Sequence, residues 1–189
     1  METIDFAPAT DALTRIVQGV RDDQLGDRTP CTEATVADLL DHVGGLALAF
    51  RAAATKEPLP GGSAPHADGS LLEDGFRDDI AERLAALAEA WRRPTAYDGL
   101  TQAGPIEMPA EIAALVALDE VVVHGWDLAR ATGQPYDPDE ALVLACLGFA
   151  QSFEVAEGSP FGPPVSVPDD APALDRLAGA TGRDPAWTP

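Results

Sequence analysis

The chain has 189 residues, of which 46% are hydrophobic, so it is long enough for one domain with its own core and too apolar to be disordered. Its formal charge of −20, from 12 basic and 32 acidic residues, argues against nucleic acid or an anionic membrane as partner, because both require a basic patch. No apolar run approaches the roughly 20 residues of a membrane span, and the first residues carry Glu2 and Asp5 instead of a basic leader. The sequence therefore predicts a cytoplasmic protein.

Five amphipathic helices are predicted, because apolar residues recur every three to four positions in five segments. In chain order these segments run from about Ala7 to Val20, Val36 to Ala54, Leu71 to Arg92, Ala110 to Ala131 and Pro138 to Phe153. Thr35, with Asp38 three residues later, is a capping box for the second helix in which Asp replaces the usual Glu. Asp137 is expected to cap the fifth helix. Four long helices with accessories favour an all-α bundle.

Proline and glycine separate these helices. The connection from Glu57 to Gly69 is rich in both, as expected of a long crossover or a lid over a binding site. The segment from Thr95 to Pro109 is predicted to be irregular. We expect Gly133 and Pro135 to end the fourth helix.

The C-terminal tail, residues 157–189, differs in composition from the rest of the chain. Its prolines forbid long helices, so only a short helix from Ala173 to Ala180 and a strand from Val165 to Val167 are candidates there. The aromatic residues Phe161 and Trp187 suggest that the tail packs on the bundle.

The two cysteines, Cys31 and Cys146, lie far apart and have no CxxC partner, which excludes a zinc finger. A disulfide is not expected in a reducing compartment. Cys146 lies in an apolar helical run and is expected in the core. Cys31 lies beside a helix start, where a reactive thiol is an alternative to the favoured structural role.

Two of the three histidines, His42 and His124, lie inside predicted helices. Glu120 and His124 are four residues apart and therefore share one helix face, in a stripe that otherwise carries apolar residues to the core. A shared cation would offset the cost of burying them, because a carboxylate and neutral imidazoles are good ligands for zinc, nickel or iron(II). With His42 from a facing helix as third ligand, one position would stay open, as in catalytic sites.

Other roles for these polar residues stay open at this point. Glu120 and His124 form an ordinary stabilising pair in many helices. Asp127 is a candidate to hold an imidazole of the metal site, or to pair at the surface with Arg130 or Arg15. His66, in the long connection, is a conceivable fourth ligand, although a solvated loop histidine is favoured.

Several segments carry a resemblance to a known family. They are Arg28 to Val43 (RTPCTEATVADLLDHV), Glu120 to Gly133 (EVVVHGWDLARATG) and the tail segments Phe161 to Leu177 and Gly182 to Trp187. In these segments the chain resembles the DinB-like superfamily, specifically the actinobacterial metal-binding group related to the N-terminal domain of mycothiol-dependent maleylpyruvate isomerase.

The resemblance implies a DinB-like four-helix bundle, here with an extra helix and the Pro-rich tail, forming a single domain over residues 1–189. It also implies a divalent metal, most readily zinc, held by His42, Glu120 and His124, with the thiol of mycothiol as cosubstrate at the open position. Two departures limit the comparison. Ala34 occupies the place of a frequent tryptophan, and the tail stands where the isomerase has a second domain. Only the thiol and metal chemistry is therefore carried over.

Three functions follow from this reasoning. The leading hypothesis is a metal-dependent transferase or isomerase that joins a small thiol to a small electrophile. The second is a metal-binding bundle without catalysis. The third is a metal-dependent hydrolase, for which Asp127 is the candidate base. The sequence leaves the electrophile and the oligomeric state open, with a homodimer as one alternative.

Overall fold

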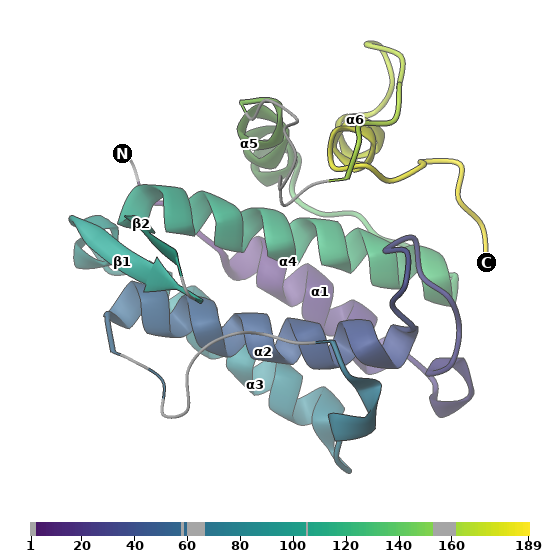
Figure 1. Ribbon diagram of the computed structural model, residues 1–189, viewed down its shortest axis with the longest axis horizontal. Coiled ribbons are helices and arrows are strands. Elements are labelled where there is room, and N and C mark those ends of the chain that lie inside the picture. Colours follow the sequence, from purple (N-terminus) through teal and green to yellow (C-terminus); the bar gives the residue numbers. More distant parts are fainter. Residues whose placement is uncertain (1–2, 58, 60–66, 105, 153–161) are drawn as a thin grey trace.

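Helices dominate the computed structural model, which describes residues 3–57, 59, 67–104, 106–152 and 162–189 (Figure 1). The α-helices of this described part are α1 (Ala7–Gly19), α2 (Val36–Thr55), α3 (Phe76–Trp91), α4 (Ala110–Thr132), α5 (Glu140–Gln151) and α6 (Ala173–Ala180). Three 3-10 turns join them: η1 (Asp22–Gln24), η2 (Gly69–Leu71) and η3 (Pro94–Tyr97). A single antiparallel hairpin, β1 (Leu100–Ala103) with β2 (Ile106–Pro109), completes the described elements. The prediction of an all-α bundle is confirmed.

The first four helices form the bundle. Helix α1 packs against α3 and α4, and α2 packs against the same two helices. Each helix contributes a leucine that is at most 1% exposed, namely Leu13, Leu40, Leu84 and Leu118. Burial of one such side chain contributes roughly 1.5–3 kcal/mol, so the apolar stripes hold the four helices together.

The capping box fixes the start of α2. The hydroxyl of Thr35 accepts a hydrogen bond from the backbone N–H of Asp38 at 3.2 Å, and the Asp38 carboxylate accepts one from the N–H of Thr35 at 2.9 Å. Both interactions satisfy donors that a helix start leaves unpaired. The predicted cap is thereby confirmed, and it places His42 in the second turn of α2.

Helix α4 lies between two layers. The bundle covers one side of it, and α5 and α6 lie over the other (Figure 1). This explains why α4 is rich in Ala and Val and is buried almost all round. It ends at Gly133, whose φ of 68° is left-handed, as the sequence predicts.

Three elements differ from the expectation. Helix α3 begins at Phe76 and not near Leu71, because Gly75 adopts a φ of 85° that a right-handed helix cannot include. The stretch expected to be irregular contains the β1–β2 hairpin, in which Thr101 alone is buried. Asp139, and not Asp137, caps α5, since its carboxylate accepts hydrogen bonds from two backbone N–H groups.

The tail packs as expected where it is described. Helix α6 has the predicted bounds and lies against α5, and Trp187 packs against the core. The proposed strand from Val165 to Val167 is absent, although the N–H of Val165 donates to the carbonyl of Gly179 at 2.9 Å. Phe161 lies outside the described residues. None of the described helices is both long and apolar enough to cross a membrane.

Candidate functional site

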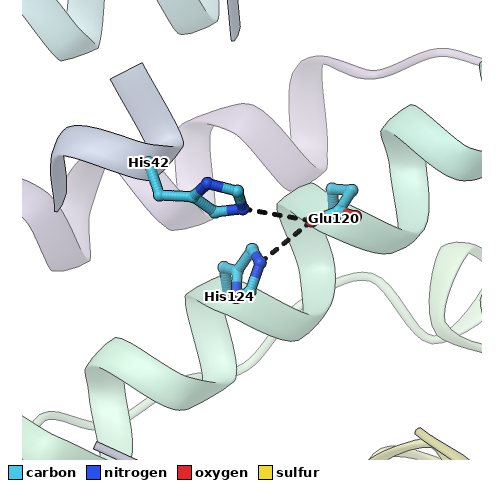
Figure 2. A group of neighbouring side chains, drawn as sticks. All are labelled: His42, Glu120 and His124. Atoms are coloured by element: carbon cyan, nitrogen blue, oxygen red, sulfur yellow. Dashed lines mark ion pairs between the residues drawn. The ribbon is translucent and has the colours of Figure 1, made fainter. Parts of the chain in front are cut away.

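His42, Glu120 and His124 come together where α2 faces α4 (Figure 2). One ligand atom from each lies within 4.8 Å of the others. Glu120 Oε2 is 2.9 Å from His124 Nε2 and 4.0 Å from His42 Nε2, so both imidazoles turn the same nitrogen toward one carboxylate. The two rings stand nearly perpendicular, with centroids 5.2 Å apart. Two helices thus present two imidazoles and a carboxylate to one point, which is the donor set that borderline divalent metals prefer.

The buried His124 ring is held at both nitrogens. Its Nδ1 lies 3.0 Å from Asp127 Oδ2, and its Nε2 faces Glu120. Burial alone would lower the pKa of His124, but the hydrogen bonds to Asp127 and Glu120 outweigh it and raise the pKa to about 9. Burial would likewise raise the pKa of Glu120, and the hydrogen bond with His124 brings it below its usual value.

Asp127 is completely buried and has a second partner, Arg183. Arg183 Nη2 donates to Asp127 Oδ2 at 3.0 Å, and its Nε donates to Oδ1 at 3.3 Å. Burial would raise the Asp127 pKa, but the hydrogen bond to His124 and the charge of Arg183 hold it below its ordinary value. Removing one partner of such a buried pair typically lowers the free energy of unfolding by about 3–5 kcal/mol. The Arg183–Asp127 pair therefore holds the tail on α4 more strongly than a surface ion pair would.

A cavity of about 310 Å³ opens above the three side chains. His42, Glu120 and His124 form one wall, and Cys31, from the segment before α2, lies on another. The tail supplies the remaining side through residues 181–183 and Gly162. The volume is at the lower end of the range for small-molecule sites, so the cavity suits a small ligand.

Two further groups line the cavity. Asp119 was not singled out from the sequence, and the role of Cys31 was left open. Asp119 is 4% exposed, and burial, with the neighbouring charge of Glu120, raises its pKa to about 7. Burial and then the charge of Asp127 raise the pKa of Cys31, so its thiol stays protonated at neutral pH. Both cysteines are free, and Cys146 is buried as predicted.

The structure resolves the open assignment of Asp127. It contacts His124 and Arg183, whereas Arg130 donates to the carbonyl oxygen of Pro185. No spacing pattern points to Arg183, because it is 56 residues from Asp127 and follows the short helix of the tail. The prediction for His66 falls outside the described residues.

Known proteins resemble this chain in sequence and in fold. The family model described as "Mycothiol maleylpyruvate isomerase N-terminal domain" matches residues 6–129, which is more than half of the chain. The chain belongs to this family. The matched region contains His42, Glu120, His124 and Asp127 but ends before α5, α6 and Arg183.

Individual proteins and solved structures are also similar to this chain. The uncharacterized protein Rv0738 of Mycobacterium tuberculosis is 33% identical over 183 residues, covering 93% of each chain, and the corresponding protein MT0763 of another strain matches equally. Two crystal structures of the mycothiol-dependent maleylpyruvate isomerase, one of a mutant, share the fold with TM-scores of 0.55 and 0.53 and 23% identity. The alignment covers 75% of this chain and 63% of the isomerase, so the chain matches less than two thirds of that enzyme's length.

Proposed function

We propose that this protein is a transferase or isomerase that binds a divalent metal ion, with zinc as the leading candidate, and joins a small thiol to a small electrophile. The observation that carries the proposal is the convergence of His42, Glu120 and His124 in the wall of a cavity. Three protein ligands leave a coordination position for a substrate, which distinguishes a catalytic from a purely structural zinc site.

The residues present fit such an ion. His124 can offer the lone pair of Nε2 once that nitrogen has lost its proton, since its Nδ1 proton is directed to Asp127. His42 also turns its Nε2 toward Glu120. The partly exposed Glu120 carboxylate lies between the two rings and supplies the one formal negative charge. When bound, a divalent ion would lower the pKa of a coordinating thiol and so supply a nucleophile at neutral pH.

The family supports mycothiol as that thiol, because the related isomerase depends on it by name. The geometry of the chain's own residues favours an external thiol for an independent reason, since the described group that could hold a metal comprises His42, Glu120 and His124 and does not include Cys31. Two neutral imidazoles and one carboxylate would leave a net charge of about +1 on a divalent centre, which an anionic thiolate neutralises. His42, Glu120 and His124 would hold the ion, and the cavity beside them would receive the thiol and its small electrophilic partner.

The hydrolase alternative requires a base that reaches the cavity. Asp127 does not serve, because it is completely buried and both its oxygens are engaged by Arg183. Asp119, which lines the cavity, would have to take that role. A bundle that binds metal without catalysis remains the other alternative.

Elemental analysis of the purified protein tests the metal centre. We expect close to one divalent ion per chain, lost in His42→Ala and in His124→Ala. His66→Ala is the matched control, because it removes the third histidine of the chain and should leave the metal in place. Full metal content in both His42→Ala and His124→Ala would show that the ion binds elsewhere.

Cobalt substitution tests the thiol. Adding mycothiol, or a simple thiol as a surrogate, to the cobalt-loaded protein should produce a thiolate-to-cobalt charge-transfer band in the near ultraviolet. Without cobalt the band should be absent. A cobalt spectrum that responds to no thiol would remove the thiol-dependent reaction and leave the hydrolase or the passive metal-binding bundle.

A further inference from the structure

The tail reaches the candidate metal centre through one side chain. Arg183 follows α6 and lies outside the region that the family model matches, yet its guanidinium approaches both oxygens of Asp127. Its third contact is with its own segment, where Nη1 donates to the carbonyl oxygen of Thr181 at 2.8 Å. The guanidinium therefore binds the backbone of the tail through Nη1 and the Asp127 carboxylate of α4 through Nε and Nη2.

A chain of hydrogen bonds leads from this guanidinium to the centre. Asp127 Oδ2 accepts from Arg183 Nη2 and lies 3.0 Å from His124 Nδ1, and the opposite nitrogen of the ring faces Glu120. Asp127 is 0% exposed, so no bulk water competes for its oxygens. A carboxylate that accepts from Nδ1 fixes both the tautomer and the orientation of a metal-binding imidazole. The fork of an arginine holds a carboxylate more rigidly than a single donor does.

We propose that Arg183 is a positioning residue of the metal centre, acting through Asp127 to orient His124, so that the C-terminal tail is an integral part of this centre. The proposal rests on the proposed function, because it assumes that His124 binds a metal ion. Arg183 touches neither the ion nor the reacting groups in this role. Its effect is on the affinity of the centre for metal.

The chain offers a matched control for this role. Arg130 also ties the tail to α4, since its guanidinium donates to the carbonyl oxygen of Pro185 and lies over the ring of Trp126. It makes no contact with Asp127 among the hydrogen bonds of the described residues. Arg130→Gln therefore loosens the same segment without touching the Asp127–His124 pair.

The test is the zinc affinity of the full chain, measured by competition with a chromophoric chelator. Because substitution of groups that orient metal ligands typically weakens binding 10- to 100-fold, Arg183→Gln should weaken zinc binding by about tenfold or more. Arg130→Gln should bind zinc as the native chain does. The double variant Arg183→Gln/Asp127→Asn should bind no more weakly than Asp127→Asn alone, because both residues act on one path.

A second readout reports the ring directly. In the cobalt-loaded protein, the exchangeable Nδ1 proton of His124 should give a shifted proton resonance. It is identified by its loss or shift in Asp127→Asn, which removes the carboxylate that accepts from Nδ1 and keeps the three metal ligands. In Arg183→Gln this resonance should broaden or vanish through faster exchange with water, whereas in Arg130→Gln it should persist. Arg183→Lys keeps the buried charge without the fork, so it should fold even where Arg183→Gln does not, and its resonance should shift.

The outcomes separate the inference from the proposed function. If the native chain binds no metal, the metal centre itself fails and the inference fails with it. If the native chain binds zinc and both Arg183 variants match it in affinity and resonance, only the inference is overturned. Equal losses in Arg130→Gln and Arg183→Gln would also overturn it, since general loosening of the tail would then explain both.

Discussion

His124 stands between two carboxylates, and this arrangement decides how a metal ion competes with a proton. Without metal, the ring is close to both Asp127 and Glu120, and its pKa of about 9 means that both nitrogens are protonated at pH 7. A metal ion needs the lone pair of Nε2, which faces Glu120. Binding must therefore displace a proton from a ring that the fold itself stabilises in its charged form.

The first prediction concerns this exchange. At pH 7 the binding of one zinc ion should release about one proton from His124, and the affinity should rise about tenfold per pH unit until the pH reaches about 9. The affinity rises with pH because a proton on His124 opposes the metal, and the raised pKa of His124 extends this competition to higher pH. Calorimetric titrations in buffers of different ionisation enthalpy measure the number released. An affinity that is flat between pH 7 and 9 would contradict the prediction.

Cys31 supplies the second prediction. The loop around it is held by Thr29, whose hydroxyl lies 2.9 Å from the carbonyl oxygens of both Cys31 and Ala34, so the Cys31 side chain is not needed for the loop. Cys31→Ser should therefore keep the metal content of the native chain, as measured by elemental analysis beside His42→Ala. Loss of metal in Cys31→Ser would mean that the thiol belongs to the ligand set.

At the level of the elements, the packing of α6 depends on a glycine. A Cβ at Gly179 would lie 2.4 Å from a methyl group of Val167 and 2.7 Å from the carbonyl oxygen of Val165. The same Val165 donates its N–H to the Gly179 carbonyl, so the tail backbone crosses α6 at this point. Gly148, in α5, has no atom within 4 Å of the corresponding Cβ position.

The third prediction compares alanine at these two glycines. In Gly148→Ala the free energy of unfolding should rise by about 0.5–1 kcal/mol, because alanine loses less backbone entropy in a helix. In Gly179→Ala it should fall, because overpacking costs about 1–3 kcal/mol and exceeds that gain. Urea unfolding of both variants measures the difference. Equal changes of the same sign would show that the tail does not press on α6.

The elements also show where reasoning from sequence succeeds. Helices with a clear apolar stripe and a capping signal were predicted within a few residues, as at Thr35 and Gly133. The hairpin was missed because Leu100 and Ile106 are 59% and 58% exposed, so no alternation of buried and exposed residues marks the strands.

The residues of the candidate site also differ in whether the sequence alone could predict them. Glu120 and His124 could be paired from their spacing on one helix. His42 was expected as a third ligand from a facing helix, and the family resemblance implies the same three residues. Arg183 could not be assigned, because its contact with Asp127 joins segments 56 residues apart through tertiary packing alone. The aromatic Trp187 and the family resemblance of the segment from Gly182 to Trp187 indicated that this part of the chain packs on the bundle, but neither pointed to Arg183.

At the scale of the whole molecule, the tail and the bundle share buried surface. Leu177 and Ala178 of α6 are 1% and 3% exposed, and Trp126 of α4 lines a small gap together with them. The Arg183–Asp127 pair adds a buried electrostatic contact between the same parts. We therefore expect residues 1–189 to behave as one domain, although the family model covers only residues 6–129.

The fourth prediction tests this unity. If the tail and the bundle form one cooperative unit, they should unfold together, because two-state unfolding gives coincident transitions for different probes. Circular dichroism in the far ultraviolet reports the helices, and the difference in fluorescence between the native chain and Trp187→Phe reports the tail. Trp187 suits this purpose because it packs against the core without being fully buried. The two midpoints in urea should agree. A transition of the Trp187 signal at lower urea would show that the tail detaches while the bundle stays folded. The metal affinity should then fall over the same range of urea concentration, because Arg183 would separate from Asp127 before the bundle unfolds.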